Sequence, residues 1–83
     1  MKVNLRYFAS LRETMGTGSE TVETTAATLG ALRDELIARG GAHAQALGRD
    51  KVMRAALNQT MSDESALLAE GAEVGFFPPV TGG

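Results

Sequence analysis

The last eight residues suit one kind of chemistry, the activation of a C-terminal carboxylate. They read Phe-Phe-Pro-Pro-Val-Thr-Gly-Gly and end at Gly83. Pro78 and Pro79 lack a backbone N–H and favour an extended conformation, so they project the chain from the domain in a stiff form. Gly82 and Gly83 have no Cβ and fit a channel too narrow for other residues. The carboxylate of Gly83, with a reference pKa of about 3.5, would enter such a channel first and ionised.

A carboxylate becomes reactive once ATP converts it to an acyl adenylate. A sulfur nucleophile can then displace AMP and leave a thiocarboxylate, which is a reactive sulfur on a long arm. The chain contains no cysteine, so it cannot hold sulfur as a persulfide on its own side chain. Residues 16–18 (Gly-Thr-Gly) lack the lysine and the spacing of a phosphate-binding loop. We therefore expect a partner enzyme to use the ATP, and no cofactor to be bound by this chain.

Composition narrows the classes of partner. The chain has 83 residues, a net charge of -2 and no long basic run, which argues against a nucleic-acid partner. No apolar stretch approaches the roughly 18 residues of a membrane span, and the first residues alternate in polarity, unlike a signal peptide. We therefore expect one cytoplasmic domain without a membrane partner.

Other candidate groups have plainer interpretations. His43 is the only histidine, and with alanines beside it and no carboxylate or hydroxyl pattern it is interpreted as a surface residue. The carboxylates at 63–64 and 70–73 fall in expected loops, where they favour solubility rather than acid–base catalysis. No cluster has metal-ligand spacing, so no metal site is expected.

Hydrophobic periodicity predicts an α+β fold. Alternation of apolar and polar residues indicates four strands, at 2–8, 20–24, 52–57 and 72–77. In the first strand the odd-numbered residues face the core, which places Phe8 on the polar face. In the last strand Phe76 is the core residue and Phe77 the exposed one. The order of elements predicts a mixed sheet with one main helix packed across it.

The main helix is expected between residues 25 and 41, with Thr28 as its N-cap and Gly40-Gly41 as its end. Its apolar stripe is Leu29, Leu32, Leu36 and Ile37. Shorter helical pieces are expected at 9–15 and 42–47, and a turn at Asn58-Gln59. Residues 62–71 are expected to form a loop, in which Leu67 and Leu68 cover the edge of the core.

Three segments resemble the small subunit of molybdopterin synthase, a family of sulfur carriers. They are the last eight residues, Leu-Asn-Gln-Thr at 57–60, and Phe-Ala-Ser-Leu-Arg-Glu at 8–13. A terminal Gly-Gly is common to all ubiquitin-like carriers, whereas Phe-Phe-Pro-Pro before it is more specific. The resemblance covers nearly the whole chain, although Gly75 stands where alanine is usual. It implies a β-grasp (ubiquitin-like) domain over residues 1–77 and an extended tail over 78–83.

The resemblance also implies a route for sulfur. An activating enzyme adenylates Gly83, a sulfur donor protein supplies the sulfur, and a thiocarboxylate results. A large subunit then receives this sulfur and transfers it to cyclic pyranopterin monophosphate, which forms the dithiolene of the molybdenum cofactor. Two small and two large subunits would form a heterotetramer. Within it this chain would not be catalytic alone and would contribute Gly83, with Gly82 beside it, to the reaction.

Three apolar residues have no obvious place in the core: Phe8, Met61 and Phe77. They can simply cover the edge of a small core, since isolated exposed apolar side chains are normal. Alternatively they form a patch that docks the large subunit, because aromatic side chains typically anchor such patches. Matching positions in the family support docking by all three. The residues that would follow them into the partner are Pro78, Pro79, Val80 and Thr81.

Arg12 matches an arginine of the family, where it could pair with an acidic activating enzyme. An exposed helical arginine is more often just a solvated charge. Two alternative functions stay open. One is a sulfur carrier for thiamine synthesis or tRNA thiolation, with the same tail chemistry and a different docking surface. The other is a ubiquitin-like binding or conjugation module without a sulfur role.

Overall fold

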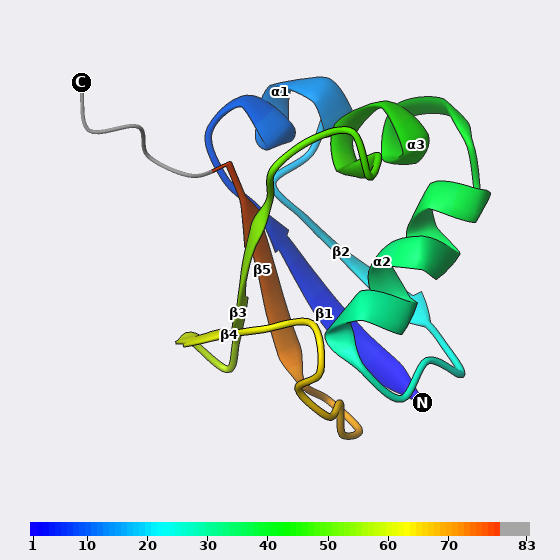
Figure 1. Ribbon diagram of the computed structural model, residues 1–83, viewed down its shortest axis with the longest axis vertical. Helices are drawn as coiled ribbons and strands as arrows, with labels where there is room; N and C mark the ends of the chain where they lie inside the picture. Colours follow the sequence, from blue (N-terminus) through cyan, green and yellow to red (C-terminus); the bar gives the residue numbers. More distant parts are fainter. Residues whose placement is uncertain (79–83) are drawn as a thin grey trace.

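Five strands form one mixed sheet in the computed structural model, which describes residues 1–78 (Figure 1). The elements in chain order are β1 (Lys2–Tyr7), α1 (Ser10–Met15), β2 (Ser19–Glu23), α2 (Leu29–Ala38), α3 (Gly41–Leu47), β3 (Arg54–Leu57), β4 (Thr60–Ser62) and β5 (Glu73–Phe77). The strand order is β2-β1-β5-β3-β4, with β1 parallel to β5 and the other neighbours antiparallel. The predicted α+β class and mixed sheet are confirmed.

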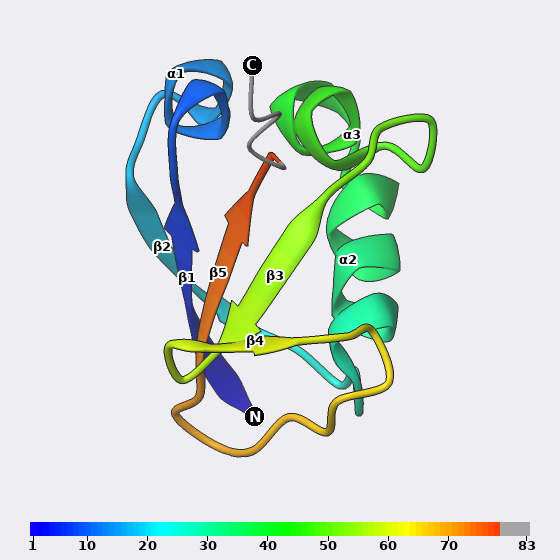
Figure 2. The same cartoon turned by 60° about the vertical axis from the view of Figure 1, so that its left-hand side comes forward.

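The main helix, α2, packs across one face of the sheet, while α1 and α3 lie near the ends of β1 and β5 (Figures 1 and 2). Thr28 is the N-cap as predicted, since its side chain accepts a hydrogen bond of 3.2 Å from the Ala31 N–H. The core between helix and sheet includes the predicted strand and stripe residues Val3, Leu5, Tyr7, Leu29, Leu32, Leu36, Val74 and Phe76. No helix within residues 1–78 is long and apolar enough to cross a membrane.

Strand β4 was not predicted. It forms a hairpin with β3 through Asn58 and Gln59, which have φ values of 50° and 69°. Two successive positive φ values are typical of a type I′ turn, whose twist suits a hairpin. Asn58 also binds β5, since its N–H donates to the Glu73 carbonyl at 2.8 Å and its Oδ1 accepts from the Glu73 N–H at 3.0 Å. The predicted turn at Asn58-Gln59 is therefore confirmed, whereas the strand after it was missed, because the turn lacks the glycine at its second position that usually signals a hairpin.

Three other expectations need correction. Leu67 was expected to cover the core but is 74 % exposed, whereas Leu68 packs against the core as expected. The strand expected from residue 52 begins at Arg54, and Val52 is exposed. The first strand ends at Tyr7, one residue before its expected end, because Ala9 turns the chain with a positive φ of 54°.

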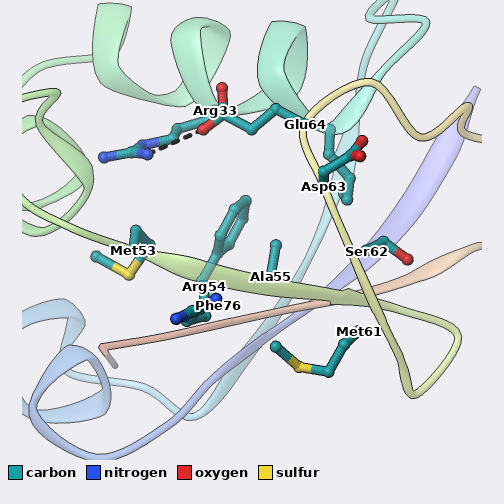
Figure 3. A pocket seen from close by; sticks show the side chains of 10 residues that line it. Arg33, Met53, Arg54, Ala55, Met61, Ser62, Asp63, Glu64 and Phe76 are labelled. Atoms are coloured by element: carbon teal, nitrogen blue, oxygen red, sulfur yellow. Dashed lines mark hydrogen bonds and ion pairs between the residues drawn. The ribbon is translucent and has the colours of Figure 1, made fainter. Parts of the chain in front are cut away.

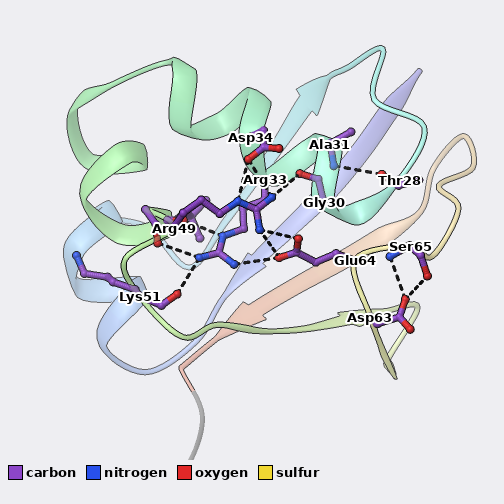
Figure 4. A network of polar contacts seen from close by, with 12 residues as sticks. Thr28, Gly30, Ala31, Arg33, Asp34, Arg49, Lys51, Asp63, Glu64 and Ser65 are labelled. Carbon is purple, nitrogen blue, oxygen red and sulfur yellow. Dashed lines mark hydrogen bonds and ion pairs between the residues drawn. The ribbon is translucent and has the colours of Figure 1, made fainter.

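A buried arginine that the periodicity did not indicate joins α2 to the segment that follows α3. The Arg33 side chain is 6 % exposed, and its guanidinium donates to the carbonyls of Leu47 (2.8 Å), Gly48 (2.9 Å) and Lys51 (3.0 Å) (Figure 4). A fourth bond of 3.0 Å runs to Glu64, beyond β4. Arg33 therefore donates to three carbonyl groups at the end of α3 and in its connection to β3, of which the Gly48 carbonyl also accepts from the Lys51 N–H at 3.0 Å.

Replacing Arg33 by alanine should lower the free energy of unfolding by about 3 kcal/mol, because polar backbone groups lose their partners where water cannot fully replace them. The measurement is equilibrium unfolding in urea. Arg49→Ala is the matched control: Arg49 also binds Glu64 but its side chain is 45 % exposed, so its loss should cost less than about 1 kcal/mol. Equal losses in the two variants would show that Arg33 has no special role.

A second polar cluster joins β1, β2, α2 and α3. The buried Tyr7 hydroxyl donates to Glu20 at 2.8 Å, while His43 Nε2 lies 3.1 Å and Arg39 Nη1 3.5 Å from the same carboxylate. His43 was interpreted as a surface residue without a carboxylate partner; it is partly buried and has one, which the chain supplies from 23 residues away. Burial works to raise the pKa of Glu20, but the hydrogen bonds from Tyr7 and His43, with nearby positive charge, lower it.

Tyr7→Phe should destabilise the protein by about 1 kcal/mol at pH 7 and by less in acid. A folded-state pKa below the ordinary 4.5 means that Glu20 stabilises the fold fully above that value and loses this contribution as the pH falls through the lowered pKa. In Tyr7→Phe the pKa of Glu20 moves back toward 4.5, so the free energy of unfolding of the variant falls less between pH 7 and pH 3 than that of the wild type. Urea unfolding of both proteins from pH 7 to pH 3 tests this. A difference that does not change with pH would contradict it.

Candidate functional site

Strand β5 carries the chain toward its C-terminal arm. It lies between β1 and β3, hydrogen-bonded to both, and its last paired residue is Phe77, opposite Arg54. Pro78 follows outside the strand, as expected of a residue without an N–H. The remaining predicted arm residues lie outside the described part of the chain: Pro79, Val80, Thr81, Gly82 and Gly83.

The face of the sheet opposite the helices presents a group of apolar residues beside the end of β5. Residues directly opposite one another in neighbouring strands share a face. Met61 is opposite Ala56, and Ala56 is opposite Gly75. Phe77, two residues beyond Gly75, and Phe8, at the end of β1, lie on the same side by alternation. We call this group the apolar sheet face: Phe8, Ala56, Met61, Gly75 and Phe77.

Two aromatic rings form the part of this face nearest the arm. Phe8 and Phe77 contact in a T-shaped arrangement, with ring centroids 6.2 Å apart and an interplanar angle of 83°. The Arg6 guanidinium lies 5.8 Å from the centroid of the Phe8 ring, within the range of a cation–π interaction. Phe8 is 44 % and Met61 57 % exposed, whereas Phe77 is half-buried. The face is therefore apolar, partly open to solvent and flanked by positive charge.

The turn after β1 fixes the Phe8 backbone. Ala9 has φ 54° and ψ −131°, close to the first central residue of a type II′ turn, and the Leu11 N–H donates to the Phe8 carbonyl at 3.1 Å. The Phe8 N–H donates to the Phe76 carbonyl of β5 at 3.3 Å. Both backbone polar groups of Phe8 are thus engaged, which leaves its side chain as the part that can move.

The structure brings Phe8, Met61 and Phe77 to one face and leaves Arg12 apart from it. Arg12 is exposed on α1, and its guanidinium lies beside Gly18 at the start of β2. Sequence analysis missed two members of the face, Ala56 and Gly75. Only the strand register places them there, and a single sequence does not give that register.

A groove of about 410 Å³ lies between α2 and the strands β3 and β4, and its lining includes Met61 as well as Ala55 and Phe76. Met61 and Ala55 point to opposite sides of these strands, and Phe76 contributes to the floor on the Ala55 side (Figure 3). The groove's carboxylates are already engaged. A hydrogen bond from the Ser65 hydroxyl lowers the pKa of Asp63, and one from Arg49 is the main cause that lowers the pKa of Glu64.

Both groove carboxylates are therefore ionised at neutral pH, which suits ion pairing better than acid–base catalysis. Within residues 1–78 no group of three His, Cys, Asp or Glu side chains could hold a metal ion. Of the residues singled out from the sequence, those that the structure brings together form a surface for contact rather than a catalytic cluster.

Solved structures with the same arrangement of strands and helices are ubiquitin-like β-grasp proteins, which confirms the predicted fold. The structure of SAMP1 from Haloferax volcanii matches with a TM-score of 0.80 and 26 % identity over 100 % of both chains. A protein–protein complex of subunits 1 and 2 of the molybdopterin-converting factor from Helicobacter pylori contains a chain that matches with a TM-score of 0.70 and 27 % identity over 100 % of both chains.

The sequence pattern of the ThiS family matches residues 5–83, and the chain belongs to this family. The molybdopterin synthase sulfur carrier subunit of Escherichia coli is 41 % identical over 81 residues, which are 98 % of this chain and 99 % of the relative. The subunit of the same name from Haemophilus influenzae is 38 % identical with the same coverage. The resemblance stated from the sequence is therefore confirmed.

Proposed function

We propose that this chain is a sulfur carrier for molybdopterin synthesis, with the carboxylate of Gly83 as its working group. One observation carries the proposal: the family match extends through Gly83, and relatives that align over 98 % of the chain are sulfur carrier subunits. The position of β5 supports it, because a strand held on both sides gives the arm a firm base.

The chemistry would proceed in balanced steps. An activating partner uses ATP to convert the Gly83 carboxylate to an acyl adenylate and releases pyrophosphate. The persulfide of a sulfur donor protein attacks the carbonyl carbon, so that a C–S bond forms, the C–O bond to the phosphate breaks and AMP leaves. A second thiol then attacks the S–S bond of this acyl disulfide, which frees the Gly83 thiocarboxylate and leaves a disulfide between that thiol and the donor. The thiocarboxylate sulfur then attacks cyclic pyranopterin monophosphate in a large subunit. Hydrolysis of the resulting thioester returns the Gly83 carboxylate. This chemistry consumes ATP, so we place the protein in the cytoplasm.

We propose the apolar sheet face as the surface that docks the large subunit. It lies beside the end of β5, so a partner that covers it also stands where the arm leaves the domain. Aromatic side chains next to a positively charged rim are common in the centre of protein interfaces. Arg12, which lies apart from this face, would be free to contact the activating enzyme.

Reconstitution tests the sulfur role. Protein incubated with an activating enzyme, ATP and a sulfur donor should gain one sulfur in place of one oxygen by intact mass. Mixed with a molybdopterin synthase large subunit and cyclic pyranopterin monophosphate, it should then form the dithiolene product. Deletion of Gly83 should abolish both results while the far-UV spectrum stays unchanged.

The alternatives predict different outcomes in the same assay. A thiocarboxylate without dithiolene product would favour a sulfur carrier of another pathway. Isopeptide adducts on lysines of other proteins, with no sulfur gained, would favour a conjugation module. Either result would overturn the proposed function.

Met61→Asp should weaken binding to the large subunit at least about tenfold, because it places a charge on the apolar sheet face. Leu67→Asp is the matched control: Leu67 is 74 % exposed, compared with 57 % for Met61, and lies in the loop after β4. Both side chains are exposed, so neither change should unfold the protein. Isothermal titration calorimetry with the purified large subunit measures the affinities. Equal affinities for the two variants would argue against docking through this face.

A further inference from the structure

We propose that Gly75 is a positioning residue for the Phe8 ring, and that the space above its Cα sets the shape of the docking surface. The proposal rests on the proposed function, since it deepens the role of the apolar sheet face. It assigns an interface role to a residue that has no side chain and is itself buried.

The Phe8 ring occupies the space that a side chain at position 75 would take. A Cβ built on Gly75 would lie 3.0 Å from Phe8 Cε2, 3.8 Å from Cδ2 and 3.9 Å from Cζ. The first distance is shorter than carbon–carbon van der Waals contact, which begins near 3.5 Å. The ring edge therefore rests directly on the β5 backbone, and a side chain at position 75 would press the ring outward, slightly for alanine and further for a larger residue.

The backbone of Gly75 does not itself require glycine. Its φ is not among the positive values of residues 1–78, whereas Gly71, nearby in the chain, has a φ of 78°. Glycine within a paired strand weakens the strand, because it adds conformational freedom to the unfolded chain and no packing to the folded one. The backbone conformation therefore does not explain the glycine at position 75, whereas the close approach of the Phe8 ring does.

A displaced ring would change the face that the partner meets. The backbone of Phe8 is held by hydrogen bonds on both sides of the residue, so a side chain at position 75 must be accommodated by movement of the Phe8 ring, by a few tenths of an ångström for alanine and by more for a larger residue. That movement alters the T-shaped contact with Phe77 and the approach of the Arg6 guanidinium to the ring. The fold can tolerate this change because the atom that meets the Cβ belongs to the outer part of a side chain.

A double-mutant cycle tests the coupling, with the full chain and the purified large subunit in calorimetric titrations. Gly75→Val should weaken binding about tenfold in the wild-type background, whereas Gly75→Ala, the residue usual in the family, should weaken it less. In a Phe8→Ala background the valine substitution should alter the affinity less than about twofold, since no ring remains to be displaced. Gly18→Val is the matched control: its Cβ would crowd a flexible side chain in the same way, 3.2 Å from Arg12 Nε, away from the sheet face.

A second measurement reports the ring position without a partner. The Gly75 Hα proton that points toward the ring edge should resonate downfield, because the ring current deshields protons in the plane of an aromatic ring, and Phe8→Ala should move this resonance upfield. A Gly75 Hα resonance that Phe8→Ala leaves unchanged would overturn the inference, as would a Gly75→Val variant that binds like wild type or weakens binding equally without Phe8. If the wild type does not bind the large subunit at all, the proposed function fails together with the docking role of Gly75.

Discussion

The fold depends on one buried guanidinium. Arg33 points from α2 into the connection between α3 and β3 and satisfies the carbonyl groups of Leu47, Gly48 and Lys51. Without such a donor this segment would need water or its own regular structure, and it could not lie so closely against α2. Because the segment leads directly into β3, the same contact fixes the strand that flanks β5. Arg33 of α2 thus helps to position β3 in the sheet, because it binds the backbone of the connection that leads into this strand.

The two faces of the sheet have different tasks. The face that the helices cover contains the core. It also contains the Glu64 carboxylate, which forms ion pairs with Arg33 and Arg49. The other side carries few apolar residues, and they gather where β5 ends. In the proposed function, this division would leave the reactive chemistry to the C-terminal arm, and the domain would position that arm. A domain that holds a strand rigidly between two others can direct an arm that supplies its own chemical group.

Much of the fold could be predicted from periodicity, because the core positions of β1, α2 and β5 follow the repeat of a strand or a helix. What periodicity missed depends on contacts between distant residues. Arg33 is a charged residue whose partners come from two later segments, and His43 meets Glu20 from 23 positions away. The β4 hairpin uses Asn58 and Gln59 where glycine is usual, so its turn was visible but its strand was not. Phe8, Met61 and Phe77 were recognised as apolar residues outside the core, whereas Gly75 and Ala56 required the register.

The parallel pairing of β1 with β5 has a mechanical consequence. A partner that draws in the C-terminus pulls along the axis of β5, so the hydrogen bonds to β1 and β3 on either side are loaded in shear, many at once, rather than opened one after another. Tension applied at one end of the molecule is therefore shared by the centre of the sheet. In the proposed function, a domain that resists tension in this way would stay folded while successive partner proteins bind and release its C-terminus.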